Sequence, residues 1–317
     1  MEVDLHPLGI PLVTPLKRLS IPIGLLPHEN MAGELIENGG VSRCRLEYLR
    51  TLNQGTYGVV QLLKRTGASG TQRLVCKRPT AAADKGGLLA EGVIQNVANL
   101  ALIRAGIGGA VPNVYDIFMH GGECRFTMEY IDGRSALDAI FHSDNPDLAF
   151  IQCLGQICII LGVLEATIFL DHRDLKMTNI WIRRVPVTYS VGGVSLSFPF
   201  QVVILDFGFA CIGDGRGATM INLGDVIPDI DPCPKNGRDL YQCIMSLWSV
   251  ELVRSKLSAD MQSEIKGWLE AVRGSNLRLT DTNTSLEWTY LLTSHPKFNH
   301  NPLRPDNLLM KLMERLK

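Results

Sequence analysis

"HRDLKMTNIWIRR", residues 172–184, places a histidine, an arginine, an aspartate, a lysine and an asparagine within eight residues. These residues are His172, Arg173, Asp174, Lys176 and Asn179. The stretch is either a solvated charged turn that precedes a strand, or a site in which each side chain has a separate role. The choice between the two depends on which other chemistry-bearing residues the chain carries.

The composition limits the classes of protein that fit. The chain has 317 residues, of which 46% are hydrophobic and 20% charged, as in soluble globular proteins with a sizeable core. A net charge of −1 gives no broad basic field, so we expect no nucleic-acid partner. The eight cysteines form no Cys-x-x-Cys pair and stand beside no histidine at zinc spacing. We therefore expect neither a metal cage nor a disulfide framework, and an intracellular, cytoplasmic location.

Apolar stretches give no sign of a secreted or membrane-spanning protein. Prolines and charges interrupt the apolar residues at the beginning of the chain, so we expect no secretion signal. The longest apolar stretch, residues 154–170, is too short for a membrane span and carries Glu165. We interpret it as a buried helix and expect no membrane partner.

The residue patterns divide the chain into three parts. Residues 1–45 are rich in proline and leucine without a clear period, which predicts an irregular, partly ordered extension. Residues 46–132 carry short β-branched runs and one helical pattern at 86–106, which predicts a small sheet with one helix. Residues 133–317 are mainly helical in pattern. An alternating pattern around Gly192-Gly193 predicts an inserted hairpin near 186–200.

A glycine-rich stretch, LNQGTYGVVQLLK, covers residues 52–64. Gly55 and Gly58 are flanked by strand-like residues, so the stretch is either a plain hairpin turn or a hairpin whose backbone N–H groups approach phosphate oxygens. Lys77 ends the next predicted strand, where an ammonium group could meet the phosphates of a nucleotide. Glu91, in the predicted helix, is the candidate partner of this lysine; the alternative is a surface glutamate.

A second segment, residues 200–212, delivers Asp206 from an apolar strand directly into a Phe-Gly turn. When the two segments are considered together, a separate role can be assigned to each of the polar residues at 172–179. Asp174 can accept the proton of an attacking hydroxyl group, and Lys176 can neutralise a transferring phosphoryl group. The oxygens of Asn179 and Asp206 are hard ligands of the kind that Mg²⁺ prefers.

In their order along the chain these motifs resemble the eukaryotic-type protein kinase family, serine/threonine branch, from about residue 52 onward. The resemblance rests on the glycine stretch, Lys77, Glu91, MEYI at 128–131, His172-Arg173-Asp174, Lys176, Asn179 and Asp206-Phe207-Gly208. It implies an α+β, bilobal protein-kinase-like fold, with a β-rich N-lobe over residues 46–132 and a larger helical C-lobe over 133–317. ATP and Mg²⁺ would bind in the cleft between the lobes.

The resemblance also implies residue roles. Asp174 would be the catalytic base, Lys176 would contact the γ-phosphate, and Lys77 with Glu91 would form a nucleotide-orienting ion pair. Asn179 and Asp206 would hold Mg²⁺, and Asp239 would anchor the 172–179 loop from the following helix. The implied nucleotide-binding residues are Asn53, Gly55, Gly58, Val60, Val75, Lys77, Met128, Glu129, Ile131 and Trp181, with Met128 as gatekeeper and the backbone of Glu129 and Ile131 against the adenine edge.

The sequence departs from the family pattern at several positions. Asn53 replaces the first loop glycine, a mild change because asparagine tolerates positive φ. Val75 and Trp181 replace smaller residues at the positions that sandwich adenine, which predicts a tight or reshaped pocket with weakened ATP binding or altered base choice. No Ala-Pro-Glu sequence follows Gly208. Arg304 resembles the usual partner of the missing glutamate and would pair with another acid, Asp229 or Asp231.

Three functions are compatible with these residues. The first is ATP- and Mg²⁺-dependent phosphoryl transfer to serine or threonine hydroxyls of a protein substrate, which we favour because the residues for phosphate, metal and proton are all present. The second is a kinase of a small-molecule acceptor, suggested by the missing docking sequence. The third is a catalytically weak, kinase-like binding or regulatory module, suggested by Val75 and Trp181. Thr219 is either an unphosphorylated loop threonine or the hydroxyl that an activating phosphorylation would modify, where Arg173 could pair with the phosphate.

Overall fold

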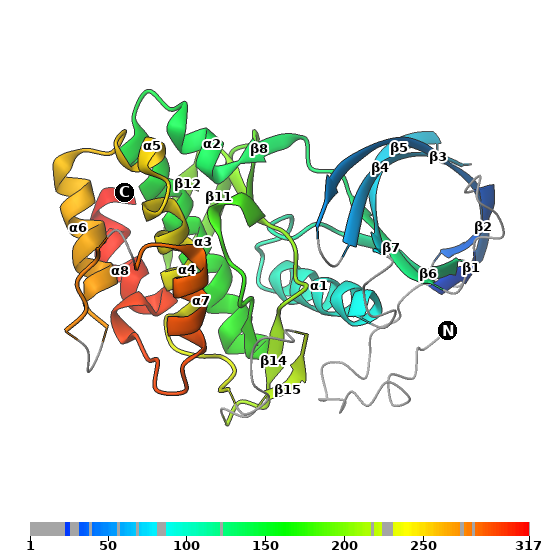
Figure 1. Cartoon of the computed structure of the whole chain (residues 1–317). Helices are drawn as coiled ribbons and strands as arrows, with labels where there is room; N and C mark the ends of the chain where they lie inside the picture. The colour runs from blue at the N-terminus through cyan, green and yellow to red at the C-terminus, as the bar shows by residue number, and fades with distance from the viewer. Residues whose placement is uncertain are drawn as a thin grey trace. The chain divides into compact units, whose positions relative to one another are not determined.

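The computed structural model describes residues 23–25, 32–37, 40–55, 58–67, 70–80, 87–120, 123–216, 219–223, 231–272, 276–280 and 283–316. The fold is mixed α+β, as predicted (Figure 1). The chain divides into two compact units. Unit 1 comprises Met1–Asn99 and Pro112–Ile131, and unit 2 comprises Leu100–Val111 and Asp132–Lys317. Residues 100–111, which the sequence placed in the first lobe, therefore belong to unit 2.

Unit 1 is a barrel of strands with one helix, α1 (Gly87–Arg104), whose last residues belong to unit 2. The strand order is β1-β2-β3-β4-β5-β7-β6, and β1 closes the barrel by pairing parallel to β6 (Figure 1). The strands are β1 Ile23–Leu25, β2 Ala32–Glu37, β3 Gly40–Gln54, β4 Gly58–Gly67, β5 Gly70–Pro79, β6 Val114–His120 and β7 Glu123–Glu129.

Alternation along β5 assigns its side chains to two faces. Leu74 and Cys76 are fully buried and form one core cluster with Leu46 and Leu63. Since successive side chains of a strand point to opposite faces, Val75 and Lys77 lie on the other face. Helix α1 packs closely on the sheet, because a Cβ added at Gly92 would lie 3.0 Å from Cδ1 of Ile117.

The first 45 residues are less irregular than predicted. They contain β1, β2 and the beginning of β3, and β2 pairs with β3 from Ala32↔Arg45 to Glu37↔Gly40. Their sequences show no regular alternation of apolar and polar residues, so the sequence pattern did not indicate these strands. The remainder of this predicted extension, residues 1–22, 26–31 and 38–39, lies outside the described residues.

Unit 2 combines helices with short sheets (Figure 1). The strand orders of these sheets are β13-β10-β8, β15-β14-β9 and β11-β12. The strands are β8 Gly133–Ser135, β9 Leu170–Asp171, β10 Ile180–Arg183, β11 Val187–Val191, β12 Val194–Phe198, β13 Gln201–Ile204, β14 Cys211–Gly213 and β15 Thr219–Asn222. The helices are α2 Ala136–Phe141, α3 Pro146–Ile168, α4 Arg238–Trp248, α5 Glu251–Arg254, α6 Ala259–Glu270, α7 Leu286–Ser294 and α8 Pro305–Leu316, with 3₁₀ turns η3 Met177–Asn179 and η4 Asn301–Leu303.

Helix α3 is the most apolar helix of unit 2. The side chain of Asn145 caps its first turn by accepting the N–H of Leu148, and the helix is followed by the cap residue Phe169, which has a φ of 53°. The helix is long and apolar enough to cross a membrane, but 67% of its most apolar window is buried inside the protein. Helix α8 packs so closely on it that a Cβ at Gly155 would lie 2.6 Å from Cδ1 of Leu316. The interpretation as part of a buried helix is thus confirmed for residues 154–168, whereas Leu170 lies in β9. The expectation that the apolar segment is too short for a membrane span does not hold for the whole helix, which begins at Pro146.

The structure has a hairpin at the residues where the sequence predicts one. Strands β11 and β12 pair antiparallel from Val187↔Phe198 to Val191↔Val194. Gly192 and Gly193 form the turn with φ values of 56° and 80°. Two consecutive positive φ values match the twist of a two-residue hairpin, and glycine adopts them without steric penalty.

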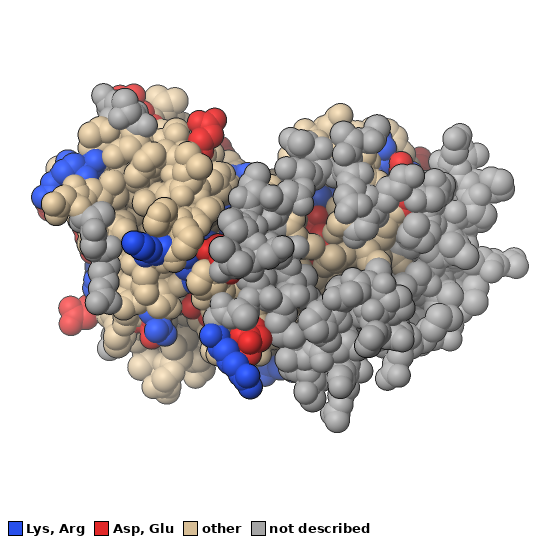
Figure 2. Space-filling view, turned by 60° about the horizontal axis from the view of Figure 1, so that its bottom comes forward, with Lys and Arg blue, Asp and Glu red and all other residues tan. Residues whose placement is uncertain are grey.

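The described surface carries both signs of charge. Figure 2 shows basic and acidic side chains interspersed among neutral ones. Some form surface ion pairs, such as Arg315 with Glu264 at 2.7 Å. Exposed pairs of this kind contribute little to stability, on the order of 0–1 kcal/mol each.

We predict that Gly133→Ala destabilises unit 2. A Cβ at position 133 in β8 would lie 2.2 Å from the carbonyl oxygen of Ile182 in β10. Because the clashing atom belongs to the backbone of a paired strand, the expected loss is about 2 kcal/mol or more. Urea unfolding followed by circular dichroism measures it as a lowered midpoint.

Gly267→Ala is the matched control for this substitution. Gly267 is exposed in α6, and an added Cβ would have no atom within 4 Å. The higher helix propensity of alanine should stabilise the protein by up to about 1 kcal/mol. Equal unfolding midpoints for Gly133→Ala and the wild type would show that β8 and β10 can separate at little cost.

Candidate functional site

Lys77 of β5 and Glu91 of α1 form a buried ion pair in unit 1. The Nζ of Lys77 lies 2.6 Å from Oε1 of Glu91, and the two residues are 8% and 3% exposed. The partner predicted for Lys77 is therefore the residue it contacts, and the alternative of a surface glutamate is wrong. Pairing offsets the desolvation of both charges and fixes the ammonium group at one position on the sheet.

Several of the predicted nucleotide-binding residues share one sheet face with Lys77. Directly paired residues of neighbouring strands project to the same side. Asn53 pairs with Val60, Val60 pairs with Lys77, and Val75 pairs with Met128. Since Val75 and Lys77 are two residues apart on β5, all five side chains lie on the same face.

The glycine-rich stretch is a hairpin, as predicted. Strand β3 ends at Gln54, β4 begins at Gly58, and the N–H of Gly55 donates to the carbonyl of Gly58 at 2.9 Å. A Cβ at Gly58 would lie 3.2 Å from Cε of Lys77, so glycine leaves room for the lysine side chain. Asn53 lies within β3 and is not among the residues with positive φ, so the tolerance invoked for it is not used. Residues 56 and 57 lie outside the described residues.

The residues predicted to meet the adenine edge are Glu129 and Ile131. The backbone N–H of Glu129 donates to the carbonyl of Asn113 at 2.9 Å and is therefore already engaged. Ile131 is buried, with 6% exposure. Trp181 belongs to unit 2, where it lies half-buried in β10 and pairs with Ser135 and Val203.

The 172–179 loop of unit 2 is anchored by Asp239, as predicted. One carboxylate oxygen of this α4 residue accepts the N–H of His172 at 2.7 Å, and the other accepts the N–H of Arg173 at 2.8 Å. A third bond to α4 comes from the N–H of Met177, which donates to Oγ of Ser246 at 2.8 Å. Arg173 has a φ of 64°, a conformation that a non-glycine residue holds only when its surroundings impose it.

Asp174, Lys176 and Asn179 meet in one cluster on this loop. The Nζ of Lys176 lies 2.9 Å from Oδ2 of Asp174. The Nδ2 of Asn179 donates to the carbonyl oxygen of Asp174 at 3.0 Å and to its Oδ2 at 3.1 Å. Asp174 and Asn179 are buried, whereas the side chain of Lys176 is 31% exposed. The sequence interpretation of a plain solvated turn is wrong for this loop.

The segment that carries Asp206 contacts the same loop through Phe207. The Phe207 ring is fully buried, and its centroid lies 4.9 Å from that of His172. The Nε2 of His172 lies 2.9 Å from the carbonyl oxygen of Leu205, and burial lowers the pKa of the imidazole. The neutral ring therefore donates a hydrogen bond to Leu205. Asp206 has a φ of 64° and is exposed, whereas the next residue, Phe207, is buried.

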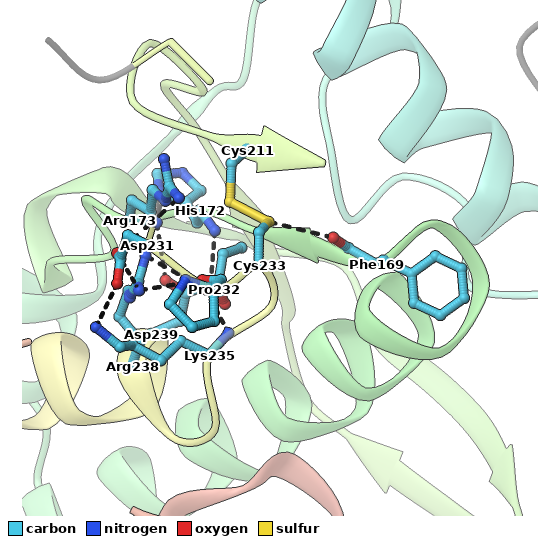
Figure 3. The surroundings of a disulfide bond; sticks show 11 residues. Phe169, His172, Arg173, Cys211, Asp231, Pro232, Cys233, Lys235, Arg238 and Asp239 are labelled. Atoms are coloured by element: carbon cyan, nitrogen blue, oxygen red, sulfur yellow. Dashed lines mark hydrogen bonds and ion pairs between the residues drawn. A yellow bond between two sulfur atoms is a disulfide. The ribbon is translucent and has the colours of Figure 1, made fainter. Parts of the chain in front are cut away.

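A buried charge network adjoins the loop (Figure 3). The Nζ of Lys235 lies 2.6 Å from Oδ1 of Asp231, and Arg238 donates to the other oxygen of the same carboxylate. The Nη1 of Arg238 also lies 3.5 Å from Oδ2 of Asp171, and Nη2 of Arg173 lies 4.0 Å from Asp231. The network thus links Asp231, Lys235 and the first residue of α4 to Asp171 and Arg173, which lie at the start of the 172–179 loop.

A disulfide bond joins Cys211 of β14 to Cys233, which lies in the turn before α4 (Figure 3). The expectation that the cysteines form no disulfide is therefore wrong for this pair. The two residues are 22 positions apart, so only tertiary structure brings them together, and a search for local cysteine spacing cannot find them. The expected reducing compartment stays a prediction.

Arg304 pairs with a neighbour in the chain, and the described contacts do not join it to Asp231, one of its two predicted partners. The Nε of Arg304 lies 3.3 Å from Oδ1 of Asp306, an exposed neighbour in α8. Asp231 is instead taken up by Lys235 and Arg238. Asp229 and the side chain of Thr219 lie outside the described residues.

The chain matches no protein-family model and no curated protein. Sequence reasoning missed Asp171, Lys235, Arg238 and the cysteine pair, although the concentration of charges in DIDPCPKNGRD, residues 229–239, was a signal.

Three acidic side chains close to the loop are strongly affected by burial. Burial raises the pKa of Glu165 to about 9, with the charges of Asp171 and Asp239 adding to the effect. Burial and the charge of Asp239 raise the pKa of Asp171 to about 7. Burial also raises the pKa of Asp239, against the effect of its two backbone hydrogen bonds. Asp239, which anchors the loop, is thus one of three acids whose charged form is disfavoured here.

We predict that Glu165→Gln stabilises the protein at alkaline pH. A raised pKa means that folded Glu165 holds a proton which the unfolded chain releases above about pH 4.5, so its contribution to stability falls as the pH rises from there to about 9. Glutamine has no such proton to lose. The melting temperature of Glu165→Gln should exceed that of the wild type near pH 8 and match it near pH 5.

Glu251→Gln serves as the control, because Glu251 is exposed in α5. Its melting temperature relative to the wild type should not vary between the two pH values. The same constancy in Glu165→Gln would contradict the assignment of a protonated Glu165.

Proposed function

We propose that this protein transfers the γ-phosphoryl group of ATP, with Mg²⁺, to serine or threonine hydroxyls of proteins. The observation that carries the proposal is the cluster of Asp174, Lys176 and Asn179 on a loop anchored by Asp239. The buried Lys77–Glu91 pair in unit 1 supports it. We further interpret units 1 and 2 as the N-lobe and C-lobe of a bilobal protein-kinase-like fold.

The residues proposed to hold Mg²⁺ have the right donor chemistry. Asn179 directs its Nδ2 at Asp174, which leaves the amide oxygen on the other side of the group. Asp206 offers a carboxylate on an exposed turn. Carboxylate and amide oxygens are the hard ligands that Mg²⁺ prefers, so Asn179 and Asp206 fit the ion. When bound, Mg²⁺ would neutralise charge on the phosphoryl oxygens of ATP.

Within the chain, Asp174 is the residue that can act on the acceptor hydroxyl. The hydrogen bond from Asn179 and the ion pair with Lys176 hold its carboxylate in one orientation, so the group is positioned before the acceptor arrives. Asp174 would accept the hydroxyl proton as the new bond forms. Lys176, half-exposed beside it, would offset negative charge on the transferring group.

Lys77 would position the phosphates of ATP in unit 1. Its ammonium group cannot move freely, because Glu91 holds it on the sheet face that Val60 and Val75 also occupy. Gly58 keeps the backbone of the neighbouring strand close to the lysine side chain. A fixed cation beside a glycine-rich hairpin is suited to a polyphosphate.

We predict that Asp174→Asn abolishes phosphoryl transfer. The amide retains the size of the carboxylate but cannot accept the hydroxyl proton, so the rate of transfer should fall by a factor on the order of 10²–10⁴. The measurement is incorporation of label from γ-labelled Mg-ATP into the protein itself and into generic protein acceptors. Phosphoamino-acid analysis then identifies serine or threonine as the acceptor.

Asp260→Asn is the control, because Asp260 is an exposed acid in the first turn of α6. Its transfer rate should equal that of the wild type. Label that persists in Asp174→Asn would refute the role of Asp174.

A small-molecule acceptor is the second candidate. The observation that favours it is that the side chains at 231–238 are engaged in contacts within the protein. These residues follow the segment in which the peptide-docking Ala-Pro-Glu sequence is missing. Here Asp231, Lys235 and Arg238 are buried in ion pairs with one another, and Cys233 is held in a disulfide. ATP consumption without protein labelling, lost in Asp174→Asn, would favour this candidate over a protein kinase.

We predict that Val75→Ala strengthens ATP binding. Val75 is 6% exposed and shares the sheet face of Lys77, so its two methyl groups would narrow the place for adenine. Their removal should lower the dissociation constant for Mg-ATP by roughly 5-fold, about 1 kcal/mol. Displacement of a fluorescent nucleotide measures the change.

Val59→Ala is the matched control, because it removes the same two methyl groups. Val59 is next to Val60 on β4, so its side chain lies on the sheet face opposite to that of Val60, Val75 and Lys77. It should lower stability without changing ATP affinity. An unchanged dissociation constant for Mg-ATP in Val75→Ala would show that Val75 does not narrow the pocket. The argument from Val75 for a weak, kinase-like binding module would then fail.

A further inference from the structure

Asp171, Cys211 and Cys233 form a cluster that the proposed phosphoryl transfer does not use. All three residues are fully buried, and a carboxylate oxygen of Asp171 and the two sulfur atoms lie within 4.8 Å of one another. The β14–β9 register places Cys211 directly opposite Asp171. The turn before α4 brings Cys233 to the same point (Figure 3). We call these residues the Asp171–Cys211–Cys233 cluster.

One oxygen of Asp171 lacks a donor. Its Oδ2 accepts the backbone N–H of Lys235 at 2.7 Å and lies 3.5 Å from Nη1 of Arg238. Its Oδ1 is buried and has no hydrogen-bond partner among the described residues. The sulfur atoms of a disulfide carry no proton, so they cannot supply the missing hydrogen bond. An unpaired carboxylate oxygen in a buried place calls for a cation or a donor.

Reduction changes the chemistry of the cluster. A dithiol reductant that closes to its own disulfide transfers two electrons and two protons, which break the Cys211–Cys233 bond and leave two thiols. Release of both protons then gives two thiolates beside the Asp171 carboxylate. Two sulfur ligands and one carboxylate oxygen are a ligand set that suits Zn²⁺, which takes four ligands in a tetrahedron. A water molecule can fill the fourth position.

The charges around the cluster favour a dication with these ligands. Three anionic ligands and one Zn²⁺ leave a net charge of −1, which the guanidinium group of Arg238 beside Asp171 offsets. Of the groups of three or more possible ligands, this is the one found among the described residues. The cysteines that are free in the described chain, Cys76, Cys124, Cys153, Cys158 and Cys243, do not belong to it.

We propose that Asp171, Cys211 and Cys233 bind Zn²⁺ when the two thiols are reduced, and that the disulfide is the oxidised, metal-free form of the same site. Either form ties β9, β14 and the turn before α4 together. Since His172 follows Asp171 directly, the site lies one residue from the loop anchored by Asp239. The proposal stands independently of the phosphoryl transfer proposed above.

The test uses Co²⁺, which replaces Zn²⁺ and reports sulfur ligands through charge-transfer absorption in the near ultraviolet. The full chain is reduced with a dithiol, desalted without oxygen, and titrated with Co²⁺. We expect one equivalent to bind with sulfur-to-cobalt and tetrahedral bands, and Zn²⁺ to displace it and bleach both. The oxidised wild type, equally folded but without thiolates, should show neither band. Absence of the bands in the reduced protein would overturn the proposal.

Variants locate the bound metal. Cys211→Ser and Cys233→Ser should each abolish the charge-transfer band, and Asp171→Asn should weaken Co²⁺ binding by at least 10-fold. Cys243→Ala removes a buried thiol outside the cluster and should leave the band unchanged. Circular dichroism confirms that each variant is folded before titration. A band that survives in folded Cys211→Ser, or that disappears in folded Cys243→Ala, would place the metal elsewhere and refute the site.

Discussion

The two hydrogen bonds from the backbone of His172 and Arg173 to the carboxylate of Asp239 hold the 172–179 loop in its shape. They fix two consecutive N–H groups, one of which belongs to a residue in a left-handed conformation. A left-handed non-glycine residue costs roughly 1–2 kcal/mol, which the paired carboxylate offsets. Ser246, seven residues further along α4, lies on the same helix face and holds Met177. The loop is therefore shaped by one face of α4.

The start of α4 is fixed by a second set of contacts. Lys235 donates to Asp231 and to the carbonyl oxygens of Thr293 and His295, so its ammonium group is fully engaged although burial lowers its pKa to about 8. The disulfide fastens the same turn to β14. Contacts made by the turn before α4 thus position the helix, and the helix holds the loop through Asp239 and Ser246.

Much of this arrangement could be predicted because the chemistry is local in sequence. Asp174, Lys176 and Asn179 lie within six residues, and the alternation around Gly192-Gly193 indicated a hairpin. The Lys77–Glu91 pair could be predicted because the predicted helix contains a single acidic residue. The disulfide could not be predicted, since Cys211 and Cys233 meet only through the pairing of β14 with β9 and the turn before α4. The strands within the first 45 residues were missed because their sequences show no regular alternation of apolar and polar residues.

The hairpin of β11 and β12 bears on how the sequence can drift over evolutionary time. Tyr189, Leu196 and Phe198 are buried, so the strands are constrained by what they cover. At the tip, side chains added to Gly192 or Gly193 would meet nothing within 4 Å, and the positive φ values are the remaining constraint there. Asparagine and aspartate accept that conformation better than most residues. Homologous chains should therefore vary at these two positions among glycine, asparagine and aspartate while they keep the apolar residues of the strands.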